Sequence, residues 1–172
     1  MYYSFAVQFT SLRLRALISL IEKVQTEAQK DNIADATILD ARLAPDMLPF
    51  SRQIQIACDN AKGMASRLAH QEAPRYEDTE TTLDELKARL EKTLDYLATF
   101  SESDFADAAT AEARFPYFPG VKLVGAGYLV TYAITNFMFH VVTAYDILRN
   151  MGFQIGKADF MGWEVEFHPD GE

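Results

Sequence analysis

The chain has 172 residues, with 25 acidic and 16 basic side chains, one cysteine, three histidines and a formal charge of −9. At roughly 150 residues per domain, this length predicts a single domain covering residues 1–172. A lone cysteine excludes an internal disulfide and any cysteine-rich zinc or iron–sulfur site. The acidic balance argues against nucleic acid as a partner. We therefore expect a cytoplasmic protein that does not bind nucleic acid.

The N-terminal segment lacks the basic start, short apolar block and cleavage site of a secretory signal. Arg13 and Arg15 interrupt its apolar positions, which argues against a membrane-spanning helix. The most apolar stretch, 125–148, is long enough to cross a membrane, but it contains His140 and Asp146. A buried central helix is the better interpretation of such a segment, so no membrane partner is expected.

Apolar residues recurring at three- and four-residue steps predict four long helices. Their expected ranges are 3–29, 45–69, 83–100 and 128–150. Asp46 is well placed to cap the second helix. Thr82 and Glu85 have the spacing of a capping box at the start of the third. The polar segment 70–81 between these two helices contains a proline and is typical of a loop.

A short β-hairpin is predicted between the third and fourth helices. Pro119-Gly120 is a strong turn signal, and residues 113–117 are expected to pair with 121–125. An isolated hairpin is marginal in water, so this one must pack on the helices or on a second copy of the chain. Its aromatic residues, which need such cover, are Phe115, Tyr117 and Phe118. The fold expected is all-α, an antiparallel four-helix bundle with this hairpin.

A polar stripe lies on the otherwise apolar fourth helix. At about 100° per residue, its members fall within an arc of roughly 80°. They are Tyr132, Asn136, His140 and Thr143, followed by Ile147. One interpretation is a satisfied hydrogen-bond network that fixes the helix register. The other is a small-molecule or metal pocket at the bundle centre, to which Asp46 and Gln53 of the second helix would also contribute.

The histidines argue against a metal centre. His70 and His168 lie at the ends of segments, and Ala144, four residues after His140, cannot bind a metal. No pair has the spacing that places two ligands on one helix face. His140 with nearby carboxylate or amide groups is a weak candidate only, so we expect no metal and no cofactor.

Several segments together resemble a known family. They are 43–50, which reads LAPDMLPF, then Gln53, then 136–149, which reads NFMFHVVTAYDILR, and finally 156–162, which reads GKADFMG. This pattern is similar to the bacterial domain of unknown function 1993, a branch of the DinB/YfiT-like helical bundles. The resemblance covers nearly the whole chain, and it implies a DinB-like four-helix bundle and a dimeric state.

Members of this wider superfamily carry a metal on three histidines, one from the second helix and two from a His-x-x-x-His on the last. In this chain His140 matches one member of that pair, Ala144 occupies the other position, and Gln53 or a neighbour stands where the second-helix histidine is expected. The metal site therefore does not transfer whole.

Two classes of function remain open. The first is a homodimeric binding or interaction module for a small polar ligand, without the three-histidine metal site. The second is a metal-dependent or histidine-assisted hydrolase or thiol transferase with His140 as general base. Cys58 is not a nucleophile candidate, because a lone helical cysteine is typical of a small buried apolar residue.

Overall fold

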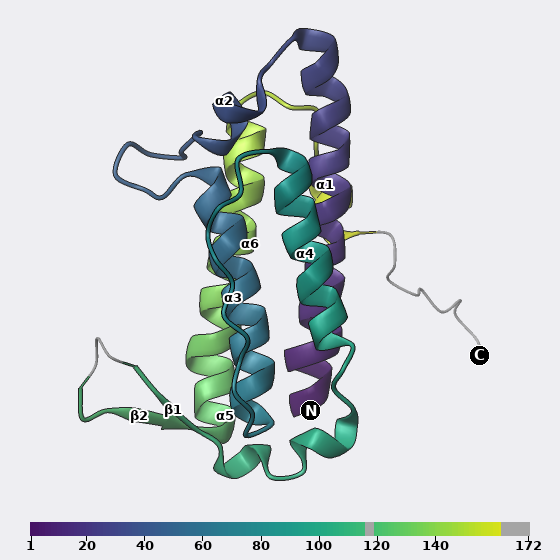
Figure 1. Cartoon of the computed structure of the whole chain (residues 1–172). Helices are drawn as coiled ribbons and strands as arrows, with labels where there is room; N and C mark the ends of the chain where they lie inside the picture. The colour runs from purple at the N-terminus through teal and green to yellow at the C-terminus, as the bar shows by residue number, and fades with distance from the viewer. Residues whose placement is uncertain (116–118, 163–172) are drawn as a thin grey trace, which may run out of the picture.

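Four long helices stand side by side in the computed structural model, which describes residues 1–115 and 119–162 (Figure 1). Amphipathic faces drive this packing, since each helix buries an apolar stripe against its neighbours. The helices are α1 (Thr10–Asp31), α3 (Phe50–Leu68), α4 (Leu83–Leu97) and α6 (Ile134–Asn150). The short helices are α2 (Asp35–Leu39), α5 (Gly125–Tyr128) and α7 (Lys157–Met161). Two π-helical turns, Ser4–Phe9 and Leu129–Ala133, lead into α1 and α6, and 3₁₀ turns cover Glu102–Phe105 and Ala108–Thr110.

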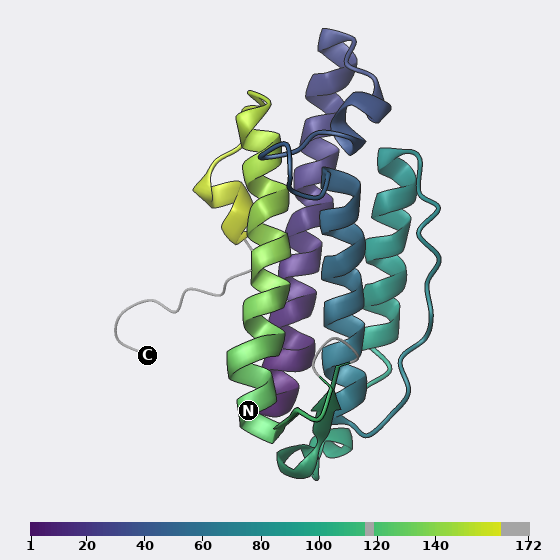
Figure 2. The same cartoon turned by 90° about the vertical axis from the view of Figure 1, so that its left-hand side faces the viewer.

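The all-α fold with a small hairpin is confirmed, with one refinement of its topology. The helix α1 runs antiparallel to α3, and α4 runs antiparallel to α6, but α3 and α4 point the same way (Figures 1 and 2). The connection 70–82 therefore returns along the whole length of the bundle before α4 begins. One continuous apolar core joins all four long helices.

The hairpin forms at the predicted turn, but its second strand is shorter than the expected 121–125, since Gly125 already begins α5. Strand β1 (Glu112–Arg114) pairs antiparallel with β2 (Lys122–Val124), and Ala113 lies opposite Leu123. Phe115 is buried, with its ring centroid 4.3 Å from that of Tyr132. This aromatic side chain is therefore covered within its own chain, while Tyr117 and Phe118 lie outside the described residues.

The start of the second long helix differs from the prediction. The helix α3 begins at Phe50, after an extended Pro49, and Asp46 lies exposed in the preceding turn rather than capping a helix. The physical reason is that the residue before a proline is pushed out of the helical region, so no helix passes through Leu48. The predicted capping box at the start of α4 is confirmed: Glu85 N–H donates to Thr82 Oγ1 at 3.2 Å, and Thr82 N–H donates to Glu85 Oε2 at 3.1 Å.

One helix of the described part, Ser4–Asp31, is long and apolar enough to cross a membrane by length and composition. The mean hydropathy of this helix is thus high enough for a membrane span even though it contains Arg13 and Arg15, which had argued against one. Half of its most apolar window is buried inside the bundle. Arg13 itself is buried and donates to the carbonyl oxygens of Phe160 and Met161 at the end of α7, a short helix that the sequence pattern did not predict.

Candidate functional site

Gln53 of α3 and His140 of α6 meet across the interface between these two helices. The Oε1 atom of Gln53 lies 2.7 Å from Nδ1 of His140, and both side chains are buried, with His140 only 8% exposed. Because α3 and α6 run antiparallel, the first turns of α3 lie beside the middle of α6 (Figure 2). The two residues therefore come together although 87 positions separate them in the sequence.

The hydrogen bonds of Gln53 fix the tautomer of His140. The side-chain nitrogen of Gln53 donates to the carbonyl oxygen of Leu48 at 2.9 Å. A carbonyl only accepts, so the amide nitrogen must face Leu48 and the amide oxygen must face His140. That oxygen also only accepts, so Nδ1 of His140 carries the proton and donates it. In the neutral imidazole, Nε2 then holds a free lone pair.

The imidazole is held neutral and its Nε2 is accessible. Burial lowers the pKa of His140 below its ordinary value. Within residues 1–115 and 119–162, Nε2 has no hydrogen-bond partner. It is also not sealed from solvent, unlike the buried side-chain atoms that lack a partner. We infer that Nε2 reaches solvent at the edge of the α3–α6 interface. Chemically, such an atom accepts a hydrogen bond or a proton from a ligand.

The lowered pKa of His140 predicts a pH-dependent stability. The unfolded chain takes up a proton near the ordinary histidine pKa of about 6.5, whereas the folded chain takes it up only at lower pH. The contribution of neutral His140 to the free energy of unfolding is therefore fully present above that value. It is lost as the pH decreases towards the pKa of His140 in the folded chain. Urea unfolding measured between neutral and mildly acidic pH checks this. His140→Gln is expected to flatten the dependence, and the same change at the exposed His70 is expected to leave it in place.

A second polar pair crosses the same interface, lower in the bundle. The side-chain nitrogen of Asn136 donates to Oδ1 of Asn60 at 2.9 Å. The amide nitrogen of Asn60 is sealed from solvent and has no hydrogen-bond partner among the described residues. Asn60 was not predicted from the sequence. The signal that could have found it is its spacing of seven residues from Gln53, which places both on one face of α3 after two helical turns.

The remaining predicted site residues occupy different surroundings. Thr143 is buried on the same side of α6, one turn beyond His140. Tyr132 packs its ring against Phe115 and Tyr128, far down the helix at the hairpin end. Asp46 is exposed in the loop before α3. The structure thus brings Gln53 and His140 together, and it does not bring Asp46 into this contact.

At the contact between α3 and α6, one of the two buried polar side chains is a histidine and the other is a glutamine. Ala144 is fully buried one turn beyond His140, at the position of the second histidine implied by the resemblance. Gln53 of α3 lies opposite, and its side-chain oxygen accepts the Nδ1 proton of His140. Among the described residues, no group of three or more His, Cys, Asp or Glu side chains is placed to hold a metal ion.

Comparison with known proteins agrees with this fold. The crystal structure of a DinB family member protein from Shewanella denitrificans is 40% identical to this chain, covers 97% of it and 95% of its own length, and superposes with a TM-score of 0.92. No curated protein matches the chain. The sequence model of the family described as Domain of unknown function (DUF1993) matches residues 2–161. The chain therefore belongs to the DUF1993 family and has a DinB-like fold.

Proposed function

We propose that this DinB-like protein is a dimeric module that binds a small polar ligand without the three-histidine metal site of its superfamily. The observation that carries the proposal is the Leu48–Gln53–His140 chain of hydrogen bonds, which presents the Nε2 lone pair as an acceptor. A ligand suited to this atom donates a hydrogen bond, as alcohols and amides do. A cytoplasmic location remains our expectation.

Two measurements test the ligand and metal parts of the proposal. Elemental analysis of untagged protein should find no stoichiometric zinc or nickel, because His140 has no second histidine beside it. Titration with small alcohols and primary amides, followed by NMR of the histidine side chains, should shift the signals of His140 and leave those of His70 unchanged. Stoichiometric metal, or a set of fragments that never perturbs His140, would contradict the proposal.

The dimer is proposed to form through the outer face of α6. The stretch between Lys122 and Asp146 contains no Asp, Glu, Lys or Arg. It exposes 54% of Phe139 on α6 and 58% of Val130 on the π-helical turn before α6. Depletion of charge and enrichment of apolar side chains are typical of the central part of an interface. The exposed hydroxyl groups in this stretch already donate to backbone carbonyl oxygens of the same stretch, so covering them costs little. These are Thr131, which donates to Gly127, and Thr135, which donates to Val130.

Light scattering at micromolar concentration checks the dimer, and the expected mass is twice that of the chain. Phe139→Glu should give a monomer, because two-fold symmetry would place two added carboxylates in one buried interface. Phe5→Glu is the matched control, since Phe5 is also exposed but lies on the π-helical turn that precedes α1. A wild-type monomer, or equal effects of both substitutions, would reject this interface.

The second candidate function is a hydrolase or thiol transferase that uses His140 as a general base. The neutral imidazole with an accessible Nε2 favours it, because a general base must be unprotonated and within reach of the substrate. Hydrolysis of an activated ester that is lost in His140→Gln and retained in His70→Gln would support this function over simple binding.

A further inference from the structure

The connection between α3 and α4 is an extended strap, defined here as residues 70–82. Because α3 and α4 are parallel, the strap must return along the bundle from the end of one helix to the start of the other (Figures 1 and 2). A helix of the length of α3 spans about 28 Å, and a fully extended strap reaches roughly 43 Å. The topology therefore requires most of the strap to stay extended.

Side chains, and not backbone pairing, attach the strap to the helices. Within the described part of the chain, no backbone–backbone hydrogen bond involves residues 72–81, and no residue of the strap is buried. An open hollow of about 480 Å³ lies beside it, lined in part by Tyr76, Glu80 and Arg89. Segments with exposed backbone and few buried contacts belong to the least stable part of a fold.

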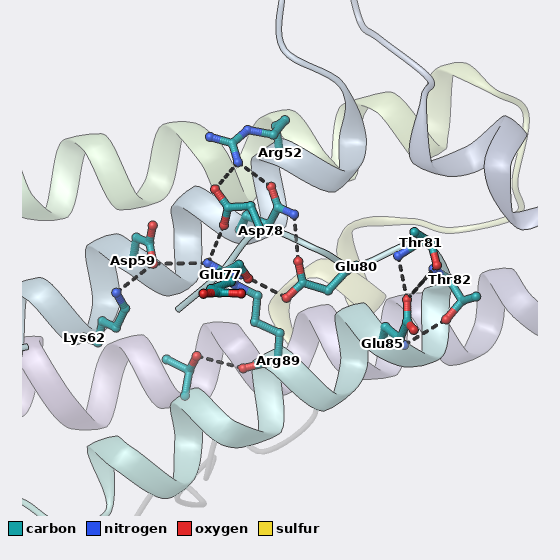
Figure 3. A network of polar contacts seen from close by, with 12 residues as sticks. Arg52, Asp59, Lys62, Glu77, Asp78, Glu80, Thr81, Thr82, Glu85 and Arg89 are labelled. Carbon is teal, nitrogen blue, oxygen red and sulfur yellow. Dashed lines mark hydrogen bonds and ion pairs between the residues drawn. The ribbon is translucent and has the colours of Figure 1, made fainter. Parts of the chain in front are cut away.

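Arg89 of α4 is the central anchor of the strap (Figure 3). Its Nη1 donates to the carbonyl oxygen of Glu77 and to Oε1 of Glu80, both at 2.9 Å. Its Nη2 lies 2.9 Å from Asp78 Oδ1 and 3.2 Å from Asp59 Oδ1 of α3. The side chain of Arg89 is only 2% exposed. One buried guanidinium on α4 thus binds three residues of the strap and one residue of α3.

The helix α3 binds the same two carboxylates of the strap from the other side. Arg52 forms an ion pair with Asp78, and the amide nitrogen of Gln55 donates to Glu80 Oε2 at 2.7 Å (Figure 3). The ring of Tyr76, also on the strap, lies among basic groups. Those within cation–π distance of its centroid are Lys62 at 4.7 Å, Lys92 at 4.3 Å and Arg89 at 5.5 Å. An acidic strap therefore lies on a basic strip of helix surface.

Desolvation limits what the ion pairs contribute to the closed strap. Attraction inside a buried ion pair is largely offset by the cost of removing both charges from water, and opening returns these groups to solvent. Removing only Arg89 has a larger effect, because Glu80 then loses its cation while Asp78 and Asp59 keep only Arg52 and Lys62, respectively. Arg89 therefore makes the largest set of contacts to the strap, and Arg52 and Gln55 of α3 add one contact each.

Cys58 lies on α3 beneath this network. It is fully buried, it is the one cysteine of the chain, and Arg89 and Glu80 are near enough to influence it electrostatically. Burial raises the pKa of the Cys58 thiol to about 11. Since the thiolate is the reactive form, the closed protein protects this thiol from reagents.

We propose that the strap is a gate that detaches from α3 and α4 while the four helices remain folded, with Arg89 as its latch. Opening uncovers Cys58 and the basic strip formed by Arg52, Lys62, Arg89 and Lys92. In the closed state the basic strip is occupied by the strap itself, through Glu77, Asp78 and Glu80.

Labelling of Cys58 with an aromatic disulfide measures the opening. The thiolate attacks the reagent, a mixed disulfide forms, and one aromatic thiolate leaves. In native conditions the rate should depend on urea less steeply than global unfolding does, because opening the strap exposes little surface. Equal urea dependence of labelling and of global unfolding would overturn the proposal.

Arg89→Met should accelerate labelling about tenfold or more while the helical circular dichroism is retained. The loss of a positive charge would by itself raise the pKa of Cys58 and slow the reaction, so acceleration reports opening. Lys87→Met is the matched control on the same helix, because the only ion pair of Lys87 in the described residues is with Asp84, outside the strap. Its labelling rate should equal that of the wild type.

Glu80→Gln provides a second variant in case Arg89→Met does not fold. It removes one charge from the latch and no heavy-atom bulk, so a smaller acceleration is expected. Trypsin gives an independent readout, since it cuts after the exposed Arg75 of the strap. Faster cutting at Arg75 in both latch variants supports the gate. Unchanged labelling and cutting in folded Arg89→Met or Glu80→Gln would exclude it.

Discussion

Gly125→Ala is expected to destabilise the protein by about 2–4 kcal/mol, through backbone strain and a steric clash. Gly125 joins β2 to α5 with a φ of +47°, in the left-handed region that alanine rarely adopts. A Cβ atom there would lie 2.4 Å from the carbonyl oxygen of Ala109. Neither group can move easily, because Gly125 N–H also donates to the carbonyl oxygen of Ala111 at 2.9 Å.

Gly127→Ala is the matched control, two residues along in the same short helix. Among the described residues, no atom beyond its chain neighbours and the backbone of its own helix lies within 4 Å of the position that its Cβ would take, and its φ is not left-handed. Alanine is the better helix former, so this change should be neutral or stabilise by up to about 1 kcal/mol. Urea unfolding followed by circular dichroism separates the two outcomes. Equal stabilities of both variants would show that the hairpin does not depend on the close approach of Gly125 to Ala109.

Phe137→Ala is expected to cost about 3–5 kcal/mol, the usual penalty for removing a fully buried aromatic ring. Phe137 is 0% exposed on α6, and its ring meets the ring of Phe9 edge to face with the centroids 6.4 Å apart. Since domains of this kind are stable by about 5–15 kcal/mol in total, the loss takes a large fraction of the stability.

Phe139→Ala tests the same residue type two positions further along the helix. Phe139 is more than half exposed, so the change should alter the stability of the single chain by no more than about 0.5 kcal/mol. If the proposed dimer forms, Phe139→Ala should weaken association and make unfolding more dependent on protein concentration. A large loss of stability that is independent of concentration would contradict the assignment of Phe139 to an interface.

The local structure of this protein was largely predictable. The capping box of Thr82 and Glu85, the Pro119-Gly120 turn and the apolar stripes of the long helices all rest on interactions between residues close in sequence. Errors occurred where one local signal opposed another. Asp46 has the chemistry of a helix cap, but the later Pro49 holds the chain extended until Phe50.

The candidate site was predictable in part. The polar stripe on α6 correctly marked His140 and Asn136 as side chains that need partners, and Gln53 was among the candidates. The sequence did not indicate Asn60, nor the carbonyl oxygen of Leu48 that orients Gln53. Backbone carbonyls are present at every position, so no sequence pattern indicates which of them will orient an amide.

By itself, the sequence determined the helical class and the hairpin, because these follow from periodicity and local turn chemistry. Only the tertiary structure decided that α3 and α4 run parallel. A polar connection of 13 residues is compatible with a loose loop or a full-length return, and the choice depends on how the apolar faces of all four helices fit together. The burial of Arg89 beneath the strap follows from that choice, since only a returning segment brings Asp78 and Glu80 to the side of α4.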